Sequence, residues 1–155
     1  MIKKIISGGQ TGADRAALDA GFELNFPIGG FCPKGRIAED GVIDDKYKLV
    51  ELQGGYAQRT KANIEGSDGT VVFYEAKLSG GTKLTANFCN QIKKPCKLID
   101  ISLTSIDSAV AELKHFTEAS QIVTLNVAGP RASGCSTIYA FVKAVISLFI
   151  NTHCL

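Results

Sequence analysis

The chain has 155 residues, of which 45% are hydrophobic and 21% are charged, and its formal net charge is +2 at pH 7. This length fits one domain with a proper core, and this balance excludes a disordered or fibrous protein. The small net charge does not support general binding to nucleic acid or to a membrane. We therefore predict one globular ligand-binding domain over residues 1–155.

The first half of the chain begins with an apolar strand over residues 2–6 that leads through a glycine-rich turn into a helix. We expect this helix to end near Gly21, because glycine disfavours a helix interior. Residues 26–36 are rich in glycine and proline, which predicts irregular structure. A short strand over 47–52 and a helix over 56–65 follow, and a left-handed cap at Gly66 is expected to end that helix.

The second half continues to alternate strands with helices. We predict strands over 70–74, 97–101 and 121–126, and helices from about 81 to 93, from Thr104 or Ser105, and from about Ser133. The expected apolar faces are Leu84, Phe88 and Ile92 on the first of these helices, and Ile106, Val110 and Leu113 on the second. The last helix is apolar on nearly all sides, which favours a core position over a subunit interface. This order predicts an α/β fold, an open and mostly parallel sheet with helices on both faces.

Three turns between a strand and a helix carry glycine: residues 7–12, 79–82 and 128–133. Each leaves the carboxyl end of a predicted strand, where ligands bind in open parallel sheets. Glycine lets the backbone approach a ligand, and a helix N-terminus favours an anion such as phosphate. One such turn is also common without a ligand, but three indicate a shared site. The expected binding residues in these turns are Gly8, Gly9, Gln10, Thr11, Gly12, Ser79, Gly80, Gly81, Thr82, Gly129, Arg131 and Ser133.

Four basic side chains are candidates to supply positive charge to this site. Arg131 directly precedes the last helix, where a guanidinium can bind an oxyanion through two hydrogen bonds. Lys34 and Arg36 lie in the glycine-rich segment, and Arg59 shares a helix face with Asn63. Each of the four could instead be an ordinary surface charge.

The sequence shows no set of residues typical of a hydrolase or a metal site. His115 and His153 lie far from the glycine turns, and Asp14 and Asp68 have simpler explanations as a helix-terminus charge and a turn residue. The cysteines have no zinc-site spacing, so reduced packing thiols are expected, with metal or redox roles for Cys32 and Cys135 the minority interpretation. The first turn departs from the Gly-x-Gly-x-x-Gly and Walker patterns. We expect neither catalytic nor metal-ligating residues.

Several motifs in order resemble the family of putative molybdenum carriers. They are Gly8–Asp19, Gly29–Gly41, Tyr56–Thr60, Ser67–Thr70, Leu78–Thr82 and Asn126–Arg131. The resemblance implies a Rossmann-like fold, homo-oligomers, and binding of molybdenum cofactor (molybdopterin), a phosphorylated pterin whose dithiolene holds molybdenum, or of molybdate. A molybdoenzyme that accepts the cofactor would be the protein partner. The resemblance and the lack of catalytic residues favour a carrier protein rather than an enzyme. We expect a cytoplasmic location, because no signal pattern or membrane-spanning segment is evident.

The carrier family also resembles a wider group of Rossmann-like proteins that includes the cytokinin-activating phosphoribohydrolases, often labelled lysine decarboxylases. Their Gly-Gly-x-Gly-Thr-x-x-Glu motif corresponds to residues 80–85, where Thr85 takes the place of the catalytic glutamate. This difference argues against hydrolysis but not against binding of a nucleotide-like ligand. The alternatives to a carrier are therefore a nucleotide sensor and an enzyme that cleaves a nucleoside monophosphate.

Overall fold

The computed structural model describes residues 1–155 and is built around a five-stranded parallel sheet. Its strands lie in the order β2-β1-β9-β7-β8, and every neighbouring pair is parallel. The bounds are β1 (Lys4–Ile6), β2 (Ile28–Gly29), β7 (Gly69–Tyr74), β8 (Cys96–Asp100) and β9 (Thr124–Ala128). Because β1, β9 and β7 are adjacent, the loops that follow them leave the middle of one sheet edge.

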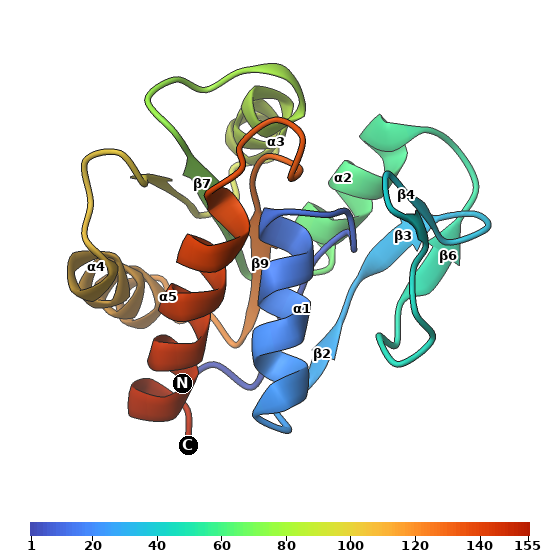
Figure 1. Cartoon of the computed structure of the whole chain (residues 1–155). Coiled ribbons are helices and arrows are strands. Elements are labelled where there is room, and N and C mark those ends of the chain that lie inside the picture. The colour runs from blue at the N-terminus through green and yellow to red at the C-terminus, as the bar shows by residue number, and fades with distance from the viewer.

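Five helices cover the two faces of this sheet (Figure 1). On one face lie α1 (Ala13–Glu23), α4 (Ile106–Ala119) and α5 (Ile138–His153), and on the other lie α2 (Tyr56–Glu65) and α3 (Gly80–Gln91). The predicted α/β fold with helices on both faces is confirmed. None of the helices combines the length and the apolar character needed to cross a membrane.

The main core contains 22 buried residues from the sheet and from the α1, α4 and α5 layer. In β7, Val71, Val72 and Phe73 are all fully buried, as expected for a strand covered on both faces. α5 packs between α1 and α4, which explains why its sequence is apolar almost all round. Ser105 caps α4, since its hydroxyl accepts a hydrogen bond from the Ser108 N–H at 3.1 Å.

Residues 26–36 and the residues that follow them contain more regular structure than we predicted, and we call residues 26–52 the glycine-rich segment. It supplies the edge strand β2 as well as β3 (Phe31–Pro33), β4 (Ile37–Ala38) and β5 (Gly41–Val42), and β3 pairs with β6 (Val50–Leu52). These strands are two or three residues long, too short to show a periodic pattern. A small second core fixes the segment on α1, formed by Leu18, Cys32, Ala38, Ile43, Tyr47 and Leu49.

Four local predictions were wrong. α1 continues past Gly21 to Glu23, and Gly66 ends α2 with φ −78° rather than in the left-handed region. α3 buries Thr82, Thr85 and Cys89, whereas its longer apolar side chains are only half-buried. α5 begins at Ile138, so residues 129–137 form a longer loop than expected.

Candidate functional site

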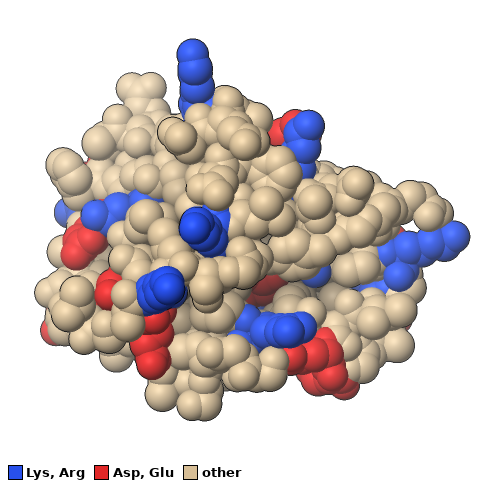
Figure 2. Space-filling model, turned by 90° about the horizontal axis from the view of Figure 1, so that it is seen from above, with Lys and Arg blue, Asp and Glu red and all other residues tan.

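The three glycine turns meet at one cleft on the carboxyl edge of the sheet. They follow the neighbouring strands β1, β9 and β7, and they bring together residues as far apart in the chain as Gln10 and Gly134. The cleft encloses about 470 Å³, and Figure 2 shows Lys and Arg side chains near the middle of this largely uncharged face. Its lining comprises Gln10, Asp14, Tyr56, Arg59, Ser79, Gly80, Gly81, Thr82, Leu84, Gly129, Pro130, Arg131 and Gly134.

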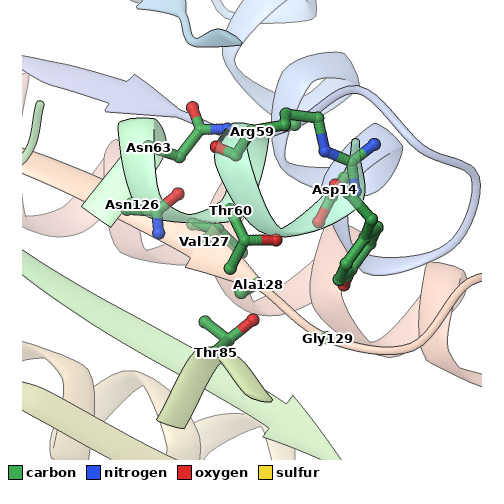
Figure 3. A pocket seen from close by; sticks show the side chains of 11 residues that line it. Asp14, Arg59, Thr60, Asn63, Thr85, Asn126, Val127, Ala128 and Gly129 are labelled. Atoms are coloured by element: carbon green, nitrogen blue, oxygen red, sulfur yellow. Dashed lines mark hydrogen bonds between the residues drawn. The ribbon is translucent and has the colours of Figure 1, made fainter. Parts of the chain in front are cut away.

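A smaller inner pocket adjoins this cleft and shares Asp14, Tyr56, Arg59 and Gly129 with it. It holds about 20 Å³, enough for roughly one water molecule. Figure 3 shows the Arg59 side chain extending from α2 toward Asp14, with Thr60 and Asn126 also at the pocket. The remaining lining residues are Gly8, Asn63, Thr85, Val127 and Ala128.

Arg59 is the main charged group of the site. Its side chain is almost fully buried at 5% exposure, yet it donates no hydrogen bond and forms no ion pair within the protein. No fully buried polar side-chain atom in the chain lacks a partner, so the unpaired guanidinium nitrogens are those open to the pocket. The guanidinium carbon lies 4.6 Å from the centre of the Tyr56 ring, which holds it in place. A buried, unpaired guanidinium is ready to bind an anion.

Asp14 places a carboxyl group beside Arg59. Burial raises the pKa of Asp14 to about 6, and the nearby Arg59 charge together with the N–H groups of Gln10 and Gly8 offsets only part of this effect. Gly8 allows this arrangement, because a Cβ there would stand 2.9 Å from Asp14 Oδ2 and 3.1 Å from Arg59 Nε. The sequence favoured a helix-terminus charge for Asp14, whereas the structure places Asp14 in the lining of both the cleft and the inner pocket.

The polar side chains of the inner pocket divide into engaged and open groups. Asn63 is engaged, since its amide bonds both the N–H and the carbonyl of Phe31, each at 2.9 Å. Thr85 donates to the Gly81 carbonyl at 3.0 Å. Asn126 donates through Nδ2 to Thr70 at 3.2 Å, which leaves its Oδ1 without a partner in the protein.

Glu39 clamps two of the glycine turns together from the glycine-rich segment. Its carboxylate accepts hydrogen bonds from the Thr11 hydroxyl and from both the N–H (3.0 Å) and the hydroxyl (2.7 Å) of Ser133. The Glu39 N–H donates to the Gln10 side chain at 2.9 Å, and Arg131 lies 3.8 Å from the carboxylate. These hydrogen bonds lower the pKa of Glu39 to about 2. Thr11 and Ser133 therefore hold the loops, and neither lines the cleft.

The first and third turns also touch directly through their backbones. Gly12 has φ +78°, and a Cβ there would lie 2.3 Å from the Pro130 carbonyl oxygen. The next residue, Ala13, donates its N–H to that same oxygen at 3.2 Å. Gly12 is thus required for the contact between the two loops, and it lines neither pocket. A Cβ at Gly9 would likewise meet the side chains of Ile43 and Leu49 rather than the cleft.

Two of the predicted basic residues lie outside the cleft. Arg36 donates hydrogen bonds to the carbonyls of Ile43, Asp44, Tyr47 and Leu49, so its guanidinium holds the glycine-rich segment together. Lys34 is exposed and lines neither pocket. The expectation that these two add charge to the cleft was wrong, because the segment that carries them folds over α1.

Other candidates also occupy structural positions. Asp68 accepts hydrogen bonds from the N–H groups of Val123 and Thr124 at 3.0 and 2.7 Å, at the opposite edge of the sheet. Cys32 is buried in the second core, and the Cys135 thiol donates to Glu75 at 3.2 Å. No group of three or more His, Cys, Asp or Glu side chains could hold a metal ion.

Sequence reasoning did not single out Tyr56, Thr60 or Asn126 as lining residues of the site. Asn126 carried a usable signal, because it is a polar residue inside an otherwise apolar strand that ends at a glycine turn. Tyr56 and Thr60 carried none, since their role depends on how α2 packs beside the sheet.

Comparison with known proteins shows the family to which this chain belongs. Residues 5–150 match the model of a family described as the circularly permutated YpsA SLOG family. The chain belongs to this family. This chain is similar to a protein from Syntrophus aciditrophicus whose crystal structure is described as that of a putative molybdenum carrier protein. The two sequences are 44% identical, the alignment covers 96% of this chain and 95% of the other, and the TM-score is 0.93. The resemblance to molybdenum carriers is thereby confirmed. A comparison with curated protein sequences found no significant match.

Proposed function

We propose that this SLOG protein binds a small anion, a phosphorylated cofactor or a related oxyanion, in the cleft and carries or stores it without transforming it. Molybdenum cofactor is the ligand we favour, with molybdate as the simpler alternative. The observation that carries the proposal is the buried, unpaired guanidinium of Arg59, which opens into a cleft formed by three backbone turns. The similarity to a protein described as a putative molybdenum carrier supports the choice of ligand.

The lining residues suggest how an oxyanion would be held. α3 begins at Gly80, and its first-turn N–H groups have no partner within the helix, so Gly80–Thr82 can donate to phosphate. The Ser79 side chain makes no capping hydrogen bond, which leaves its hydroxyl free for a ligand. Arg131 is 63% exposed beside the cleft and would add charge from the other side.

The size and chemistry of the cleft fit an organic cofactor better than a bare metal ion. Its volume of about 470 Å³ lies within the range of roughly 300–1,000 Å³ that is typical of small-molecule sites. The side chains offer no cluster of metal ligands. The protein would therefore hold the cofactor through its phosphate and its organic part, while the dithiolene of the cofactor keeps the molybdenum. Delivery to a molybdoenzyme, and assembly into homo-oligomers, belong to the same proposal.

Cleavage of a nucleoside monophosphate is the second candidate, and Asp14 is the observation that favours it. Asp14 is the only carboxylate that lines the cleft, and a pKa of about 6 suits a general acid or base. Against this, Thr85 stands where related hydrolases have glutamate. Incubation with a panel of nucleoside monophosphates tests the alternative, because release of free base at turnover rates would contradict a carrier.

Arginine substitutions test the proposed site directly. We expect Arg59→Met to weaken binding of inorganic phosphate by about 10- to 100-fold, as lost hydrogen bonds to a charged group imply, and Arg131→Ala to weaken it less because Arg131 is exposed. Lys114→Ala, which removes one positive charge from the exposed face of α4, should leave binding unchanged. Isothermal titration calorimetry measures all three. Equal affinity of Arg59→Met and the unchanged protein would refute the site.

Identification of the natural ligand needs gently purified protein. Native mass spectrometry should show the mass of a pterin cofactor bound to the chain. A bound nucleotide in its place would favour the nucleotide-sensor alternative.

A further inference from the structure

The inner pocket is too small for the anion that we assign to the cleft. Its volume of about 20 Å³ takes one water-sized group, whereas a phosphate group has five heavy atoms. The pocket and the cleft nevertheless share Asp14, Arg59 and Gly129, so a ligand in the cleft has the inner pocket beside it. A single atom or small group of the ligand can enter there.

The open groups of this pocket are two acceptors, on Asn126 and Asp14, together with the Tyr56 and Thr60 hydroxyls, which can donate or accept, and the Arg59 guanidinium. Asn126 presents only Oδ1, because Nδ2 is used by Thr70. Asp14 presents a carboxylate whose partners within the protein are backbone groups alone, the Gln10 N–H at 3.4 Å and the Gly8 N–H. Arg59 is the single charged donor, and it lines the cleft as well. A group that enters the pocket therefore meets two acceptors, from α1 and β9.

We propose that the inner pocket binds one hydrogen-bond donor of the ligand, a hydroxyl or N–H group that donates to Asp14 and Asn126. The oxyanion of the same molecule lies in the cleft, against Arg59 and the glycine turns. This inference rests on the proposed function and narrows its ligand class. The site selects phosphate esters that carry a donor near the phosphate, and it discriminates against esters whose remaining part is purely apolar.

The charge state of Asp14 gives this selection a pH dependence. The charged groups near Asp14 are Arg59 on α2 and Arg15 on α1, and the Gly8 and Gln10 N–H groups face it from the first turn. Because the pKa of Asp14 is raised to about 6, its carboxyl is ionised at pH 8 and protonated at pH 5. An ionised carboxylate is the stronger acceptor, so preference for a donor ligand should increase with pH.

Matched pairs of esters measure this preference. Glycerol 1-phosphate and ribose 5-phosphate are compared with n-propyl phosphate, which has a phosphate group but no hydroxyl, by calorimetric titration at pH 5 and pH 8. Because both esters of a pair carry a phosphate group, the ratio of their affinities cancels the effect of phosphate ionisation on binding. At pH 8 we expect at least one hydroxylated ester to bind about tenfold more tightly than propyl phosphate, and at pH 5 we expect the ratio to decrease.

Asp14→Asn keeps the shape of the side chain and removes its charge. We expect the affinity ratio in this variant to fall to about threefold or less and to lose its pH dependence. Asp107→Asn, the same change at an exposed position of α4, should keep the ratio of the unchanged protein. Asn126→Ala, which removes the second acceptor, should also lower the ratio, and circular dichroism checks that each variant is folded.

The outcomes separate this inference from the proposed function. If propyl phosphate binds as tightly as both hydroxylated esters at pH 8, or if Asp14→Asn keeps the full ratio, the donor subsite is refuted while phosphate binding stands. If the ratio increases at low pH instead, the protonated Asp14 carboxyl donates to an acceptor of the ligand, and the inference is overturned. If neither the esters nor inorganic phosphate binds, the proposed function itself fails, and the inference fails with it.

Discussion

Asp14 makes the stability of the folded protein depend on pH. Its pKa is about 6 in the folded chain and close to the ordinary value of 3.8 when unfolded, so the folded state binds the proton more tightly. Between these two values the folded state holds more protons, and the free energy of unfolding therefore decreases as pH rises from about 4 to 6. Above pH 6 Asp14 is ionised in both states, and burial of its charge lowers the free energy of unfolding by its full amount.

We expect Asp14→Asn to stabilise the protein at pH 7.5, by at most about 3 kcal/mol, and to have little effect at pH 4. The neutral amide keeps the shape of the side chain but needs no desolvation of a charge. Urea unfolding at the two pH values measures the difference. Asp107→Asn is the control, and an equal effect of Asp14→Asn at both pH values would contradict the explanation.

The glycine residues of the site could be predicted from sequence, whereas the burial of Arg59 could not. Gly8, Gly80, Gly81 and Gly129 follow from the rule that glycine turns at strand ends bind anions, and the structure places them in the lining. A rule of this kind cannot reveal burial. The sequence therefore ranked Arg59 with Lys34 and Arg36, although Arg59 alone reaches the cleft.

At the level of elements, the clamp formed by Glu39 joins the glycine-rich segment to two loops of the site. Because hydrogen bonds from Thr11 and Ser133 hold the pKa of Glu39 at about 2, the clamp is fully present above the ordinary pKa of 4.5 and is lost as pH falls through about 2. The loops should therefore stay joined at any physiological pH.

Glu39→Gln should weaken binding of inorganic phosphate by about three- to tenfold, because a neutral amide makes weaker hydrogen bonds to Thr11 and Ser133 and leaves the loops more mobile. Titration calorimetry measures the affinity, and hydrogen exchange of residues 8–12 and 129–133 measures the mobility. Glu118→Gln, an exposed change on α4, is the control. Faster exchange with unchanged affinity would show that the clamp does not support binding.

The order of the main elements could be predicted because each of them is long enough to show its period. The strands of the glycine-rich segment could not, since β2, β4 and β5 each have only two residues. Their positions depend on tertiary contacts, such as the second core around Ile43 and the Arg36 hydrogen bonds to four carbonyls. The position of Glu39 follows from the same contacts, and so no local pattern indicates it.

For the whole molecule, the packing of α5 between α1 and α4 supplies much of the main core. Ile146→Ala should lower the free energy of unfolding by about 3 kcal/mol, because Ile146 is fully buried and its loss leaves a cavity. Leu148→Ala, two residues further along the same helix and 36% exposed, should cost less than about 1 kcal/mol. Urea unfolding compares the two, and similar losses would contradict a central position of α5.

Assembly and location are further predictions at this scale. Homo-oligomers are expected, and light scattering of the purified protein measures the number of subunits. A cytoplasmic location also stays a prediction from the sequence.

Both chain termini lie at the end of the molecule opposite the α3 and β4 loops, close to each other in Figure 1. Neighbouring ends on the surface are the arrangement in which covalent joining or fusion disturbs a domain least. A fluorescent reporter attached at either end would thus stand clear of the cleft mouth. Immobilising the protein through Met1 or Leu155 on a sensor surface should leave the ligand entrance facing solution.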